Sequence, residues 1–203
     1  GEDLNSDPEQ HPSRWIICFW DWSEQKARAY REPWAWIEEH VKPERQRRDE
    51  RGEYVLRKPL PERWWQYGDK RPALYHSIGR GRHFDKHPST WNSGHNLQRV
   101  LACSLVSKYL NFAALPTDWI YAHRLAVFAT DSMAMFALLT SSINELWARK
   151  NSSSLETRLN YAPSDAFETL PLCDLSDAKL EIVGARYEVH RRMLCGSFGV
   201  GLT

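Results

Sequence analysis

Three histidines and one carboxylate lie close together in the segment HFDKHPSTWNSGH, and these residue types could bind a metal ion. They are His83, Asp85, His87 and His95. Imidazole and carboxylate groups are common zinc ligands, so one interpretation is the centre of a metal-dependent nuclease or hydrolase. The spacing is irregular, however, and the segment is rich in polar residues. We therefore expect a long polar loop at 80–96 with no stoichiometric metal.

The other catalytic signatures that a sequence can reveal are missing. The chain contains no GxGxxG, GxxxxGK[ST], GxSxG or HExxH motif, which are the patterns of nucleotide-binding, hydrolase and zinc-protease sites. Carboxylates such as Glu38 and Glu39 lie at consecutive positions of an expected helix and diverge. We therefore expect no catalytic residue and no cofactor here, and we predict that this chain alone is not an enzyme.

Basic and aromatic residues alternate in RKPLPERWWQYGDKRPALY, at 57–75. This mixture suits phosphate contact combined with base stacking. The alternative is that the aromatic rings form core while the arginines extend outward to water. Together with the loop at 80–96, the stretch supplies six cations as candidate DNA contacts: Arg63, Lys70, Arg71, Arg80, Arg82 and Lys86.

Small polar side chains next to single basic ones occur in CSLVSKYLN and TRLNY. Asn pairs well with adenine, Arg with guanine, and Ser with several base edges. The candidate base-reading group is Ser104, Ser107, Lys108, Asn111, Arg158 and Asn160. The alternative is that the two serines cap strand ends and that Asn160 is a turn residue.

The net charge of +1 conceals a basic middle third. Residues 42–108 carry 15 basic and 7 acidic side chains, a net charge of +8, whereas residues 1–41 carry 4 and 9, a net charge of −5. Such a block fits either a polyanion partner or a solvated surface.

Periodicity predicts the elements that must position these residues. We expect strands at 14–20 and within 118–130, and a strand, turn and strand across 97–115. We expect helices from Ser23, from Pro33, at 131–150 and at 176–195, with Ser132 and Asp177 among the possible N-caps.

The two C-terminal helices have different expected inner faces. The helix at 131–150 has a broad stripe: Phe136, Leu139, Ile143, Leu146 and Trp147. The helix at 176–195 has a thin one: Leu180, Val183, Tyr187 and Leu194. A long helix with a thin stripe normally packs on a further partner.

Composition predicts a soluble cytoplasmic protein. Hydrophobic residues make up 42% of the chain and charged residues 26%. Since no apolar run approaches the length of a membrane span, we expect no membrane association. The start lacks a signal-peptide pattern and a Met, which suggests a fragment. Four separated cysteines read as free thiols in a reducing compartment.

Several long blocks together resemble one protein family. They are SRWIICFWDWSEQKARAYREPWAWIEEHVKPERQRR, LRKPLPERWWQYGDKRPALY, RVLACSLVSKYLNFAAL, SSINELWARKNSSSLETRLNYAPSDAFETLPLC and GARYEVHRRML. In order, they are similar to the C-terminal target-recognition region of large bacterial adenine-specific DNA methyltransferases, of the type IIG or IIL-like restriction–modification and phage-defence class.

The resemblance implies an α+β fold in which a mixed sheet with flanking helices precedes a C-terminal spacer helix. It implies double-stranded DNA as partner, with S-adenosylmethionine bound by an upstream methyltransferase core of the same polypeptide. On this basis residues 1–50 would link to that core, 51–173 would form the target-recognition lobe, and 174–203 would begin the spacer. A metal-dependent enzyme and a protein-interaction module of a defence complex remain the alternatives.

Overall fold

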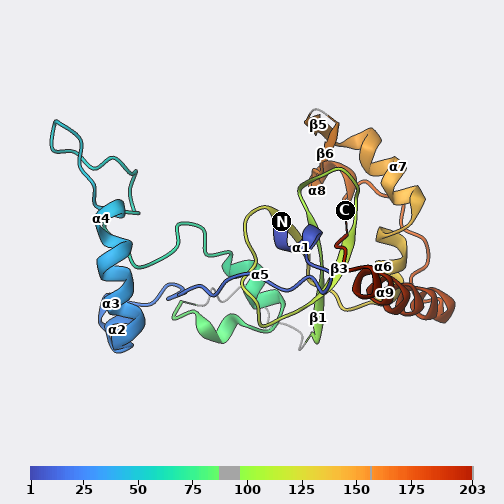
Figure 1. The fold of residues 1–203 in the computed structure, drawn as a ribbon, viewed down its shortest axis with the longest axis horizontal. Coiled ribbons are helices and arrows are strands. Elements are labelled where there is room, and N and C mark those ends of the chain that lie inside the picture. The colour runs from blue at the N-terminus through green and yellow to red at the C-terminus, as the bar shows by residue number, and fades with distance from the viewer. Residues whose placement is uncertain (87–96, 156, 203) are drawn as a thin grey trace. The chain divides into compact units, whose positions relative to one another are not determined.

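The computed structural model describes residues 1–86, 97–155 and 157–202. It has an α+β fold, as predicted, with 39% helix and 13% strand. Its two small sheets are antiparallel, whereas the resemblance implied a mixed sheet. The chain forms two compact units (Figure 1): unit 1 comprises Gly1–Ser13 and His95–Thr203, and unit 2 comprises Arg14–Gly94. These limits differ from the expected divisions at 50 and 173. The first residues and the C-terminal helix both belong to unit 1.

The main sheet of unit 1 is antiparallel, with strand order β3-β1-β4. Its strands are β1 (Arg99–Ser104), β3 (Phe112–Pro116) and β4 (Leu125–Phe128). Leu101 of β1 pairs with Ala114 on one side and Phe128 on the other. The strand–turn–strand prediction for 97–115 is thus confirmed, and β4 is the strand found within 118–130.

A second antiparallel sheet has the strand order β2-β6-β5 and contributes to the same core. Its strands are β2 (Val106–Ser107), β5 (Ser153–Leu155) and β6 (Arg158–Asn160). Leu159 of β6 is buried with Leu101, Phe112 and Phe136 in one hydrophobic cluster. The helices of unit 1 are α1 (Glu2–Ser6), α6 (Met133–Leu139), α7 (Ser142–Asn151), α8 (Pro163–Ala166) and α9 (Ala178–Phe198).

The helix predicted at 131–150 is two helices. Ser132 caps α6 as expected, by accepting from the Met135 N–H, but Ser141 caps a new helix, α7, by accepting from the Asn144 N–H. Ser and Thr side chains compete with the helical backbone in this way. Beyond this break the predicted inner face is wrong at Ile143 and Leu146, which are each 71% exposed, whereas Trp147 is half-buried.

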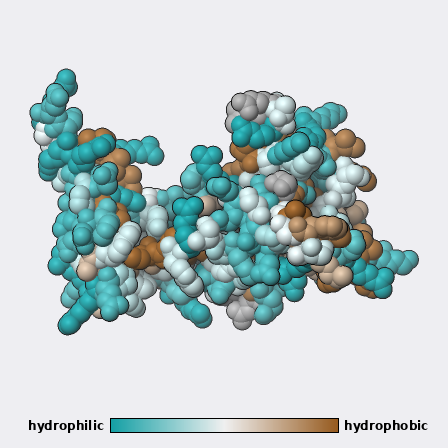
Figure 2. All heavy atoms as spheres, viewed as in Figure 1, coloured by the Kyte–Doolittle hydropathy of each residue, from teal (hydrophilic) through white to brown (hydrophobic). Residues whose placement is uncertain are grey.

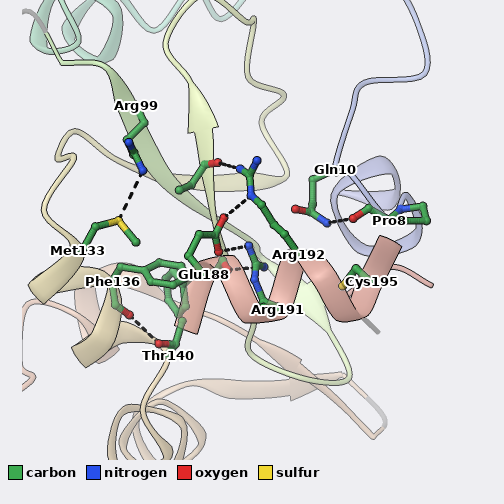
Figure 3. Close-up of polar contacts among 12 residues, drawn as sticks. Pro8, Gln10, Arg99, Met133, Phe136, Thr140, Glu188, Arg191, Arg192 and Cys195 are labelled. Atoms are coloured by element: carbon green, nitrogen blue, oxygen red, sulfur yellow. Dashed lines mark hydrogen bonds and ion pairs between the residues drawn. The ribbon is translucent and has the colours of Figure 1, made fainter. Parts of the chain in front are cut away.

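The C-terminal helix α9 lies against β3 with a polar face. Arg191 donates to the Phe112 carbonyl (3.0 Å) and Arg192 to the Ala114 carbonyl (2.9 Å), and both arginines pair with Glu188 (Figure 3). Carbonyls two residues apart point to the same side of a strand. The arginines therefore cover the outer edge of the sheet. An edge strand with unpaired backbone groups can pair with another chain and promote aggregation.

Unit 2 is built around tryptophans. Trp34 and Trp64 are buried with Phe19 and Ile37, and Trp65 donates from Nε1 to the Trp22 carbonyl at 3.0 Å. The helices of unit 2 are α2 (Glu24–Arg28), α3 (Arg31–His40), α4 (Lys42–Arg45), α5 (Pro72–Ser77) and the short 3-10 helix η1 (Gly81–His83). Core was one of the two interpretations of these aromatic residues.

The strand predicted at 14–20 is wrong. Trp20 has a φ of +46°, which no extended strand allows. Its ring stacks on His83, with centroids 4.9 Å apart and an interplanar angle of 5°, while Phe19 turns into the other aromatic cluster. The consecutive hydrophobic residues Phe19 and Trp20 therefore enter two different clusters and do not line the faces of a sheet.

Candidate nucleic-acid interface

The exposed face of the β2-β6-β5 sheet collects several of the predicted site residues. On β6, Arg158 and Asn160 are exposed whereas Leu159 between them is buried, as the two-residue repeat of a strand requires. Because Ser107 pairs with Leu159, Lys108 follows β2 at the end of the sheet where Arg158 lies. Two cations and an amide are thus brought to one face.

Helix α7 holds the backbone of this corner in place. Arg149 pairs with Glu145 one turn earlier (2.7 Å) and donates from Nη2 to the Lys108 carbonyl at 2.9 Å. The Lys108 ammonium lies 5.1 Å from the centre of the Tyr109 ring. Tyr109 is 46% exposed, so the corner presents a cation beside an aromatic face.

We call Lys108, Tyr109, Arg158 and Asn160 the sheet corner. A cation for a phosphate, an aromatic ring for stacking and an amide for a base edge are the three contact types found in nucleic-acid interfaces. Asn160 is preorganised because its Nδ2 donates to the Ser153 hydroxyl at 3.0 Å. Sequence reasoning missed Tyr109, although its position directly after Lys108 was a usable signal.

Three residues of the predicted base-reading group have other roles in the described unit. Ser104 and Ser107 are 6% and 7% exposed, and their hydroxyls donate to the carbonyls of Val106 and Tyr109. Asn111 donates from Nδ2 to the Leu202 carbonyl. The two serines thus stabilise the turn between strands, as the alternative interpretation held, and we leave all three out of the proposed interface.

Five of the six predicted cations of unit 2 divide into two kinds. Arg63, Arg82 and Lys86 are exposed, so their side chains can contact an anion in solution. Arg80 instead lies over the Trp20 ring, 5.4 Å from its centre, and Arg71 is 3.5 Å from a carboxylate oxygen of Asp69.

Lys70 sits among other cations. Burial lowers the pKa of its ammonium, and the positive charge of Arg63 lowers it further. The carboxylates of Asp21 and Asp69 act in the opposite direction and raise this pKa; Asp21 also accepts from the backbone N–H groups of Asp85 (2.8 Å) and Lys86 (2.9 Å). An arriving phosphate would relieve the repulsion around Lys70.

Net charge differs between the units. Residues 14–94 carry 17 basic and 12 acidic side chains, a net charge of +5, and the residues of unit 1 carry 10 and 14, a net charge of −4. Part of the basic block is a projecting turn at 46–56, hydrophilic in Figure 2, in which the Asp49 carboxylate accepts from the N–H groups of Arg51 and Glu53.

The polar loop expected at 80–96, which contains the three histidines, is only partly within the described residues. His83 stacks on Trp20, and burial together with Arg80 and Arg82 lowers the pKa of its imidazole. The Asp85 carboxylate pairs with Lys26, whereas His87 and His95 lie outside the described residues. Among the residues that the structure describes, no group of three or more His, Cys, Asp and Glu could hold a metal ion.

Comparisons with protein-family models, with curated proteins and with solved structures found no match. Within the described part of the chain, no helix has both the length and the apolar character needed to cross a membrane.

Proposed function

We propose that this chain binds double-stranded DNA and reads its sequence, as the target-recognition part of an adenine-specific DNA methyltransferase. The observation that carries the proposal is the sheet corner, where Lys108, Arg158 and Asn160 share one exposed region. The basic net charge of unit 2 gives further support, since phosphate neutralisation supplies most non-specific DNA affinity. The resemblance of the sequence blocks supplies the assignment to methyltransferases.

The proposed division of labour separates affinity from specificity. Arg63, Arg82 and Lys86 contact phosphates and fix the register of the protein on the duplex, and Lys108 does so beside the reading position. Asn160 and Arg158 contact base edges in the major groove, as an amide suits adenine and a guanidinium suits guanine. The methyl transfer itself, with S-adenosylmethionine and a flipped adenine, belongs to a catalytic core outside this sequence.

The salt dependence of DNA binding tests the proposal. A fluorescently labelled duplex of about 30 base pairs, long enough for several phosphate contacts, is titrated with the chain at several salt concentrations. Each phosphate neutralised contributes a slope of about −0.9 to the plot of log affinity against log salt concentration. The double variant Lys108→Ala/Arg158→Ala is expected to flatten that slope by about 0.9, the contribution of the one phosphate contact assigned to Lys108.

Lys179→Ala is the matched control, because Lys179 is an exposed cation of unit 1 at the start of α9. It is expected to leave the slope unchanged. The same slope for wild type and the double variant would remove the sheet corner from the interface, and absence of any duplex binding would refute the DNA-binding function.

Selection of bound duplexes from a random pool tests sequence reading separately. Asn160→Ala is expected to cost about 1–3 kcal/mol at one base pair and to relax the preference there alone. A uniform loss of affinity over all sequences would show that Asn160 contacts the backbone instead of a base.

A further inference from the structure

The helix α9 has the reverse of the usual amphipathic arrangement. Its buried residues are Gly184, Glu188, Arg191 and Cys195. Apolar residues instead point outward: Val183 is 56% exposed and Leu194 44%. A surface helix of a globular protein normally buries its apolar stripe, so the apolar side of α9 lacks the cover that its composition predicts.

Four exposed residues, one of them the polar His190, form a regular row with the half-buried Leu180. Leu180, Val183, Tyr187, His190 and Leu194 are separated by alternating steps of three and four residues, which is the spacing of the contact positions in a coiled coil. We call this row the outer seam. With a rotation of 100° per residue, the seam and the buried polar face occupy neighbouring but different sides of α9.

The seam is available because other contacts hold the helix to unit 1. Glu181 accepts from the N–H groups of Met133 (3.1 Å) and Ala134 (2.7 Å) at the start of α6, and Glu188 pairs with both Arg191 and Arg192. Within the seam Tyr187 shares in this packing, because its ring lies 6.1 Å from the ring of Phe136 on α6, whereas Val183, His190 and Leu194 are exposed. Figure 1 shows α9 running along the outside of unit 1.

The charges along the seam select the partner. Lys179 and Arg186 are exposed beside it, one step before Leu180 and Tyr187, at the flanking position where coiled coils place ion-pairing residues. The two carboxylates of α9, Glu181 and Glu188, are engaged by the contacts just described. A second copy of α9 would bring cations against cations, which opposes self-association.

We propose that the outer seam of α9 binds an amphipathic helix of a partner protein that carries acidic side chains along the edge of its own apolar row that meets Lys179 and Arg186. This interaction surface is separate from the sheet corner. The DNA-binding function and the helix-binding function can therefore be tested independently, and refuting one does not refute the other.

A pair of designed peptides tests the proposal on the 203-residue chain. Both have about 21 residues, the length of α9, with Leu at the contact positions; one has Glu and the other Lys at the flanking positions. Fluorescence anisotropy is expected to show the Glu peptide binding at least about tenfold more tightly, because only its flanking charges complement those of α9.

Two double variants locate the binding face. Val183→Ser/Leu194→Ser removes apolar contacts of the seam and is expected to weaken the Glu peptide by about tenfold or more. Ile182→Ser/Val189→Ser is the matched control, because both residues are exposed apolar positions of α9 more than about 100° around the helix from the centre of the seam. The control is expected to bind within about twofold of the wild type, as it leaves the contact row intact.

Three outcomes would overturn the proposal: equal affinity for the Glu and Lys peptides, an unchanged affinity in the seam variant, or no binding of either peptide. The alternative is that a second copy of α9 binds the seam. Sedimentation of the chain alone tests this alternative by measuring its oligomeric state. A dimer that dissociates in Val183→Ser/Leu194→Ser would show that another α9 occupies the seam. The substituted side chains are exposed, and unchanged far-ultraviolet circular dichroism of both variants verifies that the fold is kept.

Discussion

The close approach of α6 and α9 in unit 1 depends on the absence of one side chain. A Cβ atom at Gly184 of α9 would lie 1.9 Å from the Met133 carbonyl oxygen and 3.3 Å from the Ala137 backbone nitrogen. Real Cβ atoms essentially never come within 3.0 Å of another atom, so Gly184→Ala requires α6 and α9 to separate by at least 1.1 Å, the difference between 3.0 and 1.9 Å. The obstacle is backbone, which cannot rotate aside as a side chain can.

The expected cost follows from what that separation disrupts. Overpacking a close contact costs about 1–3 kcal/mol. Moving the helices apart also stretches the bonds from the Glu181 carboxylate to the first N–H groups of α6, which are 3.1 and 2.7 Å long, and losing such a cap costs about 1 kcal/mol. The expected destabilisation is about 3 kcal/mol, before the helix-propensity gain of Ala over Gly.

Gly196→Ala in the same helix is the matched control. Nothing lies within 4 Å of a Cβ atom built there, so only the propensity gain of about 0.5–1 kcal/mol remains and the variant is expected to be slightly more stable. Because that gain is common to both variants, the difference between their free energies of unfolding is expected to be about 3 kcal/mol.

Urea unfolding followed by far-ultraviolet circular dichroism measures the difference, with hydrogen exchange of α6 and β3 peptides to localise it to unit 1. Tryptophan fluorescence is unsuitable, since eight of the ten tryptophans lie at positions 15–91 and would report mainly on unit 2. A Gly184→Ala variant within about 1 kcal/mol of Gly196→Ala would refute the close helix contact, because overpacking alone costs that much.

Three further predictions concern single groups. Glu188→Ala leaves a buried arginine without its carboxylate and is expected to cost about 3–5 kcal/mol, whereas Arg192→Ala, whose side chain is 53% exposed, should cost about 1 kcal/mol; urea unfolding compares them. The lowered pKa of His83 means that the unfolded chain binds its proton more readily, so unit 2 should lose stability as the pH falls through about 6.5; unfolding followed by tryptophan fluorescence at pH 7.5 and about pH 5.5 measures the loss, and His83→Phe should abolish it. A thiol reagent should modify exposed Cys173 well before buried Cys103, because burial strongly raises the pKa of the Cys103 thiol; mass spectrometry of the labelled peptides gives the order, and equal rates would contradict the burial.

Local signals in the sequence predicted the elements whose limits are chemically marked. Ser23 and Asp177 both cap helices as expected, each accepting a backbone N–H of the first turn. The strand, turn and strand at 97–115 are present as β1, β2 and β3. These features depend on hydrogen bonds and propensities within a few residues, which is the range over which a sequence pattern is informative.

Elements whose pattern fitted two structures were decided by packing. The apolar run at 14–20 resembles a strand, yet it supplies two aromatic clusters of unit 2. The continuous pattern at 131–150 conceals the break at Ser141, because a serine inside a helix and a serine at a cap look alike in the sequence. The outcome in each case depends on contacts with segments far along the chain.

The candidate site shows the same division. The sequence alone determined which side chains could meet DNA, because charge and hydrogen-bonding type belong to the residue. Only the tertiary structure decided which of them share a surface: the pairing of β2 with β6 joins Lys108 to Arg158 across 50 residues, and it buries Ser107 in the same turn. It also decided that α9 buries Glu188 and Arg191 and exposes Val183 and Leu194. A helix can satisfy its charges on a strand edge as well as in water, and only the position of that edge determines which face turns inward.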